Sequence, residues 1–200
     1  MKAVIGLGNP GKEYEGTRHN VGFVVVEELA RRWRTHLRAW RHVARISKVA
    51  SSDLILAEPT TFMNASGECV ERLASFYKLE PSDTLVIVDE IQLPLGRLKF
   101  SVSGSAGGHN GLKSVVQHFG SDFPRLRIGV GRGDPQWDLA DHVLSPFRAD
   151  ERAVIQEVVG VAADGVELFL ESGVEKAMNR YNKKDDRTNQ SEILDRRSEI

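Results

Sequence analysis

Features that mark several classes of protein are scarce or absent in this chain of 200 residues. Cys69 is the single cysteine, which excludes a disulfide framework and a cysteine-ligated metal site and favours a reducing compartment. No apolar run reaches the roughly 20 residues of a membrane-spanning helix, and a predicted strand begins at once in place of a signal peptide. We therefore expect a cytoplasmic protein with no membrane association. Cys69, at helical spacing from Leu73 and Phe76, is expected to pack in the core.

Neither positive nor negative charge is in large excess in this chain. The chain carries 27 Lys and Arg against 28 Asp and Glu, a net charge of −1 at pH 7. A general coat for nucleic acid is thereby disfavoured, so any polyanion site must be local. The segment from Arg31 to Lys48 is the exception, since it has six arginines and no acidic residue. It fits either a solvated helix end followed by an edge strand or a surface that faces phosphates.

Several catalytic signatures are missing. There is no G-x-S-x-G elbow, no H-E-x-x-H and no C-x-x-C pair, so covalent serine and metal mechanisms lack support and we expect neither metal nor cofactor. The segment from Gly6 to Gly11 does match G-x-G-x-x-G after a predicted strand. The dinucleotide fingerprint, however, needs a helix that begins at its third glycine, whereas here a polar loop intervenes.

What the chain does contain is an alternation of predicted strands and helices, which is typical of a single α/β domain. We predict a three-layer sandwich with a twisted, mixed but mostly parallel central sheet and helices on both faces. Asn64 is expected to cap the second helix, and Ser172 to start a capping box for the last one. The predicted domain covers residues 1–181, and the polar segment 182–200 is expected to be a disordered tail. The predicted strands are 3–7, 41–49, 53–57, 84–88, 96–102 and 125–130, and the predicted helices are 21–33, 65–77, 112–119 and 150–170, followed by a short last helix.

Polar side chains gather in the loops that follow the predicted strands or precede the predicted helices. Ligand sites of α/β sheets form where such loops converge at the carboxyl ends of strands. A histidine beside an aspartate from another strand can activate water, because the carboxylate orients the imidazole and stabilises its protonated form. Side-chain amides can donate to an oxyanion. Each residue could equally be a turn former or a helix cap with no role in chemistry, and spacing alone does not show that the loops meet. These residues are Asn9, His19, Asn64, Asp89, His109 and Asn110.

Four segments resemble motifs of the bacterial peptidyl-tRNA hydrolase family in order and spacing: GLGNPGKEYEGTRHNVGF, PTTFMNASGE, VIVDE and GSAGGHNGLKS. The resemblance extends from Met1 to about Tyr181 and implies a seven-stranded mixed sheet. It also implies a monomeric, metal-free esterase that frees tRNA from peptidyl-tRNA dropped off the ribosome. By matched motif, His19 is the expected general base and Asp89 its partner. The expected substrate-binding residues are Asn9, Tyr14, Met63, Asn64, His109 and Asn110.

Three positions depart from the family pattern. Glu58 stands where Lys or Arg is usual, and Gln92 stands where a second Asp is common. Ser101 replaces a basic residue that usually helps to hold a tRNA phosphate. Because side chains alternate along a strand, Lys99 points to the same face as Ser101, and we predict that Lys99 and Arg127 clamp the phosphate.

A second function remains open at this point. A non-catalytic RNA-splicing partner protein, as in a plant organelle relative, would share the same fold. Such a protein would normally begin with a transit segment rich in Arg and Ser, and we expect none here.

Overall fold

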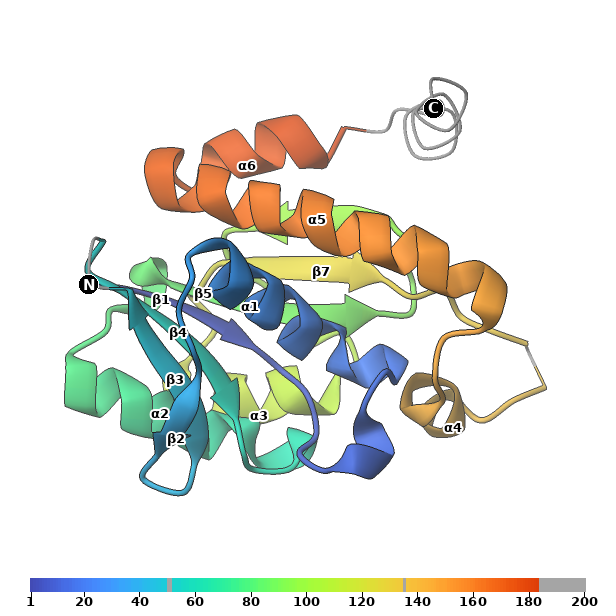
Figure 1. Cartoon of the computed structure of the whole chain (residues 1–200), viewed down its shortest axis with the longest axis horizontal. Helices are drawn as coiled ribbons and strands as arrows, with labels where there is room; N and C mark the ends of the chain where they lie inside the picture. Colours follow the sequence, from blue (N-terminus) through green and yellow to red (C-terminus); the bar gives the residue numbers. More distant parts are fainter. Residues whose placement is uncertain (50–51, 135, 184–200) are drawn as a thin grey trace.

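A single seven-stranded sheet forms the centre of the protein, which is described by a computed structural model over residues 1–49, 52–134 and 136–183 (Figure 1). The strand order is β2-β3-β4-β1-β5-β7-β6. Pairing is parallel between β4 and β1, β1 and β5, and β5 and β7, whereas β3 and β6 run against their neighbours. The predicted mixed, mostly parallel sheet is thus confirmed. The strands are β1 (Lys2–Gly6), β2 (Arg38–Trp40), β3 (Ala44–Val49), β4 (Leu54–Pro59), β5 (Thr84–Glu90), β6 (Leu98–Ser101) and β7 (Arg125–Gly129).

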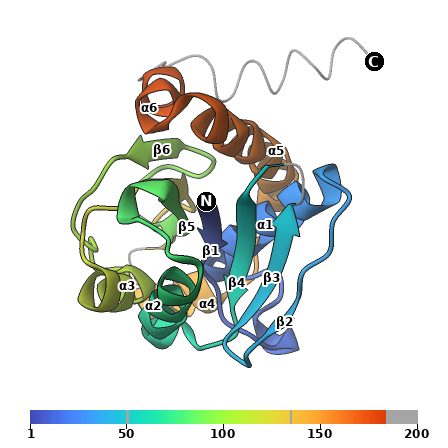
Figure 2. The same cartoon turned by 90° about the vertical axis from the view of Figure 1, so that its left-hand side faces the viewer.

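Helices cover both faces of the sheet and give the predicted three layers (Figure 2). One core lies under α1, α5 and α6, and a second core lies under α2 and α3. The central strands are buried on both faces, which accounts for their continuous apolar runs. The helices are α1 (Val21–Arg32), α2 (Ser66–Tyr77), α3 (Asn110–Phe119), α4 (Leu139–Leu144), α5 (Ala149–Ser172) and α6 (Val174–Tyr181). Among the described residues, none of these helices is both long and apolar enough to cross a membrane.

Close contact between β1 and α1 determines where the first loop of the chain ends. A Cβ on Gly6 would lie 2.1 Å from the carbonyl oxygen of Gly22, so only glycine lets the helix approach the strand this closely. The loop between them forms two short 3-10 turns, η1 (Lys12–Tyr14) and η2 (Arg18–Asn20), and α1 begins at Val21. Helix α1 therefore begins well after Gly11. This agrees with the conclusion that residues 6–11 do not form a dinucleotide site.

Two elements lie outside the sequence prediction. Strand β2 has only three residues, of which one is basic, one is small and one is aromatic. Antiparallel pairing with β3 holds it in the sheet. Helix α4 lies in a segment expected to be irregular. A contact with a residue outside the helix holds α4 in place, because the Nε2–H of buried His142 donates to the carbonyl of Gly131 over 2.9 Å. Tertiary contacts, which a local pattern does not contain, account for both elements.

Three predicted details are wrong. Asn64 does not cap α2, because it lies inside a 3-10 turn (Met63–Ala65) and Ala65 occupies the N-cap position. Ser172 does not start a capping box, because α5 continues through it and ends at Gly173, whose φ of 83° breaks the helix. Phe76 is not a core residue. It is 50% exposed, although Cys69 and Leu73 are fully buried as expected.

The folded domain extends slightly beyond the predicted boundary at residue 181. The side chain of Asn182 donates to the carbonyl of Phe100 and accepts from its N–H, both over 2.7 Å, so the amide pairs with edge strand β6. The remaining predicted tail, residues 184–200, lies outside the described residues.

Candidate active site

A cleft of about 530 Å³ opens at the carboxyl ends of the parallel strands and is lined in part by α4. Four loops and helix α4 form its walls. The lining includes Asn9, His19, Phe62, Met63, Asn64, Asp89, Glu90, Ile91, Gln92, Gly107, Gly108, His109, Asn110 and, from α4, Leu139, Ala140, Val143 and Leu144. A larger hollow of about 940 Å³ lies between α1 and α5, but its lining contains no histidine, aspartate or asparagine. The predicted constellation therefore gathers in the smaller cleft.

Asp89 lies at the centre of this cleft, at the end of β5. Its carboxylate is 2% exposed, and one oxygen, Oδ1, contacts both His19 Nδ1 at 2.8 Å and His109 Nε2 at 2.9 Å. The two imidazole rings lie 4.9 Å apart between centroids. The fold therefore brings together three residues from separate loops that the sequence only suggested could meet.

The hydrogen bonds around Asp89 assign different roles to the two histidines. A carboxylate only accepts, so each contacting ring nitrogen must carry a proton. The Nδ1 of His109 also accepts from the N–H of Leu112 at 3.2 Å, so both nitrogens of this ring are engaged. His19 uses only Nδ1, which leaves Nε2 as its unprotonated nitrogen on a residue that lines the cleft. His19 rather than His109 is thus equipped to take a proton from water.

The ionisation of Asp89 supports this assignment. Burial alone would raise the pKa of Asp89, but its interactions with His109 and then with His19 outweigh burial and hold this pKa well below its usual range. A carboxylate that is ionised at neutral pH keeps the His19 Nδ1–H oriented and favours the imidazolium that forms when Nε2 accepts a proton.

Asn9 is held in place by a partner that the sequence did not indicate. The side chain of Asn20 accepts from the Asn9 N–H at 2.8 Å and donates to the Asn9 carbonyl at 2.9 Å. The side-chain oxygen of Asn9 accepts from the N–H of Met63 at 2.8 Å. Because that oxygen is occupied, the Asn9 amide presents its nitrogen, a donor, to the cleft. Asn20 occupies the N-cap position of α1 but makes no side-chain cap bond, and its side chain positions Asn9.

The other predicted binding residues lie around this centre. Asn64 and Asn110 are exposed, and within the described chain neither side chain makes an intramolecular hydrogen bond. Met63 is buried and forms part of the floor. Tyr14 is not in the lining. It packs edge to face against Phe62, with 6.4 Å between ring centroids, so it supports the rim from behind.

Sequence comparison identifies the family to which this arrangement belongs. Residues 3–190 match the family model described as peptidyl-tRNA hydrolase. The chain belongs to the peptidyl-tRNA hydrolase family. Among its relatives, the peptidyl-tRNA hydrolase of Lachnospira eligens is 47% identical over 185 residues, which cover 91% of this chain and 100% of the relative. That of a Synechococcus species is 46% identical over 186 residues, which cover 91% of this chain and 83% of the relative.

Solved structures agree with the assignment to peptidyl-tRNA hydrolases. The crystal structure of the peptidyl-tRNA hydrolase from Acinetobacter baumannii matches this chain with a TM-score of 0.84 and 35% sequence identity. The match covers 91% of this chain and 94% of that chain. The resemblance seen in the four motifs is therefore confirmed over the whole domain.

The residues predicted to bind phosphate lie on β6 and β7, and Arg127 contacts Glu90 of the cleft lining. Lys99 and Arg127 are directly opposite each other on β6 and β7, and Ser101 is opposite Arg125. Lys99 is exposed. Arg127, by contrast, is 12% exposed and forms an ion pair with Glu90. Burial, and then the charge of nearby Arg127, lower the pKa of Arg125 to about 10.

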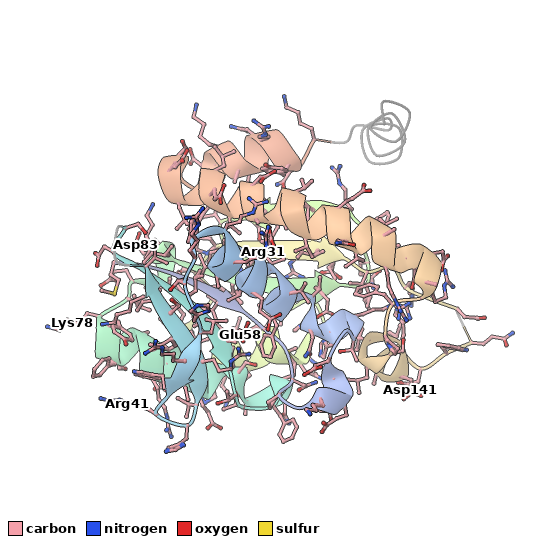
Figure 3. The ribbon with its side chains drawn as sticks, viewed as in Figure 1. Arg31, Arg41, Glu58, Lys78, Asp83 and Asp141 are labelled. Atoms are coloured by element: carbon pink, nitrogen blue, oxygen red, sulfur yellow. The ribbon has the colours of Figure 1, made fainter. Side chains whose placement is uncertain are left out.

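The basic stretch from Arg31 to Lys48 is not a uniform surface. Arg31 and Arg32 pair with Glu28, so the charges of these two arginines are largely compensated, and Arg45 lies near Glu27 and Glu58. Arg41, at the turn after β2, lies over the ring of Phe76 at 4.1 Å, at the outer edge of the sheet (Figure 3). The interpretation as a solvated helix end and edge strand accounts for the paired residues.

Glu58 is the most unusual of the three departures from the family pattern. It is 1% exposed, its Oε1 has no hydrogen-bond partner, and Arg45 approaches only Oε2 at 3.0 Å. Burial, and then the charge of Glu27, raise the pKa of Glu58 to about 8. Gln92 lies in the cleft wall.

His19, Asp89 and His109 are also the types of residue that bind divalent metals, and their ligand atoms lie within 4.8 Å of one another. In the observed arrangement, however, both imidazole nitrogens donate to the same carboxylate oxygen. These contacts are those of a hydrogen-bonded site that can transfer a proton.

Proposed function

We propose that this chain hydrolyses the ester bond between a peptide, or an N-blocked aminoacyl group, and the 3′ ribose of tRNA, with His19 as general base. The observation that supports this most directly is the His19–Asp89 pair: Nδ1 is held by a buried carboxylate at 2.8 Å, while Nε2 is left for the cleft. Membership of the peptidyl-tRNA hydrolase family supplies the substrate class.

The reaction follows from the protonation states. Nε2 of His19 takes a proton from a water molecule, whose oxygen attacks the ester carbonyl carbon. The imidazolium that forms is stabilised by Asp89. As the tetrahedral intermediate collapses, the C–O bond to the ribose breaks and Nε2–H returns its proton to the leaving 3′ oxygen.

Amide groups stabilise the charge that develops on the carbonyl oxygen. The Asn9 side-chain nitrogen is pre-oriented, because its oxygen is fixed by the N–H of Met63. Asn64 and Asn110, exposed on separate loops, bracket the peptide end of the substrate. Met63 and Tyr14 contribute to the floor and rim, and His109 donates to the same Asp89 oxygen as His19.

Replacement of His19 tests the assignment. His19→Ala should lower turnover of a peptidyl-tRNA preparation by about 10²–10⁴-fold or more, because a positioned general base contributes on this scale. Binding of deacylated tRNA, measured by gel shift, should be nearly unchanged. Near-normal turnover by the variant would remove His19 from the role of base.

The RNA is held by a small number of local contacts, among them Lys99 and Arg127. Since Glu90 already compensates Arg127, we expect exposed Lys99 to carry more of the salt-dependent binding. Lys99→Ala should weaken tRNA binding and flatten the slope of log K against log salt by about one. If the slope stays constant while loss of Arg38 or Arg41 flattens it, the RNA surface is the basic stretch.

The protein is further proposed to act as a monomer in the cytoplasm, where translation supplies peptidyl-tRNA, and to need no metal. Turnover that survives dialysis against a chelator, by a species of monomeric mass in light scattering, is the expected result. The alternative of a non-catalytic RNA-splicing partner is not favoured, because the relatives described above are hydrolases by name.

A further inference from the structure

Arg127 makes two contacts that lead back to the catalytic centre. Its Nη1 forms an ion pair with Glu90, and its Nη2 donates to the carbonyl of Ser105 at 2.8 Å. Glu90 follows Asp89 directly in the chain, and Ser105 belongs to the loop that leads into His109. One side chain therefore joins the strand that carries Asp89 to the loop that carries its partner.

Both carboxylate oxygens of Glu90 make contacts within the protein. One oxygen pairs with Arg127, and the other accepts from the N–H of Gln92 at 3.0 Å. The two side chains of the pair are 11% and 12% exposed, so the interaction is only weakly screened by solvent. Glu90 thus lines the cleft without a free oxygen for proton transfer.

The loop held by Arg127 has few other attachments. Residues 102–108 are mostly exposed. The backbone of Gly107, with φ of 59°, lies close to the guanidinium of Arg127. A Cβ at this position would lie 3.2 Å from Nη1 of Arg127. At its far end the loop is fixed by the bond from His109 to Asp89. The contacts close a ring: Asp89, Glu90, Arg127, Ser105 and His109.

We propose that Arg127 is a positioning residue for the Asp89–His109 pair, so that it contributes to turnover even on a substrate that carries no RNA phosphate. This proposal rests on the proposed hydrolase function. It differs from a role as a phosphate contact, because such a contact supplies nothing when the phosphate is missing.

The test compares two substrates in the full-length protein: peptidyl-tRNA, and an N-acylaminoacyl ester formed on the 3′ hydroxyl of adenosine, which carries no phosphate. Arg127→Gln should lower kcat by about 10-fold or more on both, because small misplacement of a catalytic group is costly. KM for the short substrate should change little. Glu90→Gln should lower kcat similarly, and the double variant should be no worse than either single one, since both remove the same link.

Two further variants keep the outcome interpretable. Arg127→Lys retains a charge for Glu90 but lacks the fork that also reaches Ser105, so an intermediate kcat is expected. If circular dichroism shows that Arg127→Gln does not fold, Arg127→Lys and Glu90→Gln take its place in the test. Arg72→Gln makes the same chemical change at an exposed position on α2 and should match the unmodified protein.

Three results would overturn the proposal: normal turnover of the short substrate by Arg127→Gln, a loss confined to KM on that substrate, or additive losses in the double variant. Each points to a contact with RNA alone or to independent effects. Failure of the unmodified protein to cleave either substrate would instead contradict the hydrolase function itself.

Discussion

Asp89 receives hydrogen bonds from two imidazoles through a single oxygen, and this sharing defines the chemistry of the cleft. The carboxylate fixes the proton of His19 on Nδ1 and thereby frees Nε2. An amide in its place can turn a donor toward Nδ1, which forces the His19 proton onto Nε2, where it blocks the base.

Asp89→Asn is therefore expected to lower kcat by about 10²–10⁴-fold with little change in KM. Steady-state kinetics on peptidyl-tRNA check this. His109→Ala, which removes one of the two donors but leaves the His19 tautomer intact, serves as the comparison and should lose less. If Asp89→Asn changes KM alone, Asp89 is a binding residue.

Among the individual residues of the site, some could be identified from the sequence and others could not. His19 and Asp89 could be predicted because both lie in family motifs and because a histidine and an aspartate together suit general-base chemistry. Asn20 could not be placed, because an asparagine before a helix looks like a cap, and only the fold brings it to the backbone of Asn9. The link from Glu90 to Arg127 spans 37 positions of the chain, which no local pattern contains.

Among the elements, η2 and α5 are tied by a buried ion pair next to the catalytic loop. Arg18 is 4% exposed and reaches Glu151 at 2.5 Å, Ser145 Oγ at 2.7 Å and the carbonyl of Pro146 at 2.7 Å. Since Ser145 follows α4, the same side chain anchors the helix that forms one wall of the cleft. His142 anchors the other side of α4 at Gly131.

Glu151→Gln should destabilise the protein by about 3 kcal/mol, because it leaves the guanidinium of Arg18 buried without its counter-charge. Urea unfolding measures the change. Asp150→Asn is a matched control one residue away. Its pair with Arg148 is 73% and 71% exposed, so a loss within about 0.5 kcal/mol is expected. Equally small losses in both variants would mean that the buried pair adds no net stability.

The elements that could be predicted are those whose own residues bury a periodic apolar face. β1 and β5 are continuous apolar runs, and α1 has a regular apolar stripe. β2 and α4 lack this signal, because one is a short edge strand held by pairing and the other is held by His142 and Arg18.

For the molecule as a whole, two buried carboxylates give the stability opposite dependences on pH. The pKa of Asp89 lies below its usual range, so its contribution is present at neutral pH and is lost as the pH falls below about 4. The pKa of Glu58 is raised from 4.5 to about 8 by burial. Folded Glu58 therefore keeps its proton at pH values where the unfolded chain has released it.

Stability should accordingly fall as the pH rises from about 5 to about 8, because the unfolded chain binds fewer protons than the folded one in that window. At about 1.4 kcal/mol per pH unit, the loss reaches at most about 5 kcal/mol, and the partly exposed Arg45 reduces it. Glu58→Gln, which is neutral at every pH, should remove this slope and be the more stable protein above pH 8. Urea melts of both proteins between pH 5 and 9 provide the measurement, and parallel curves would contradict the assignment.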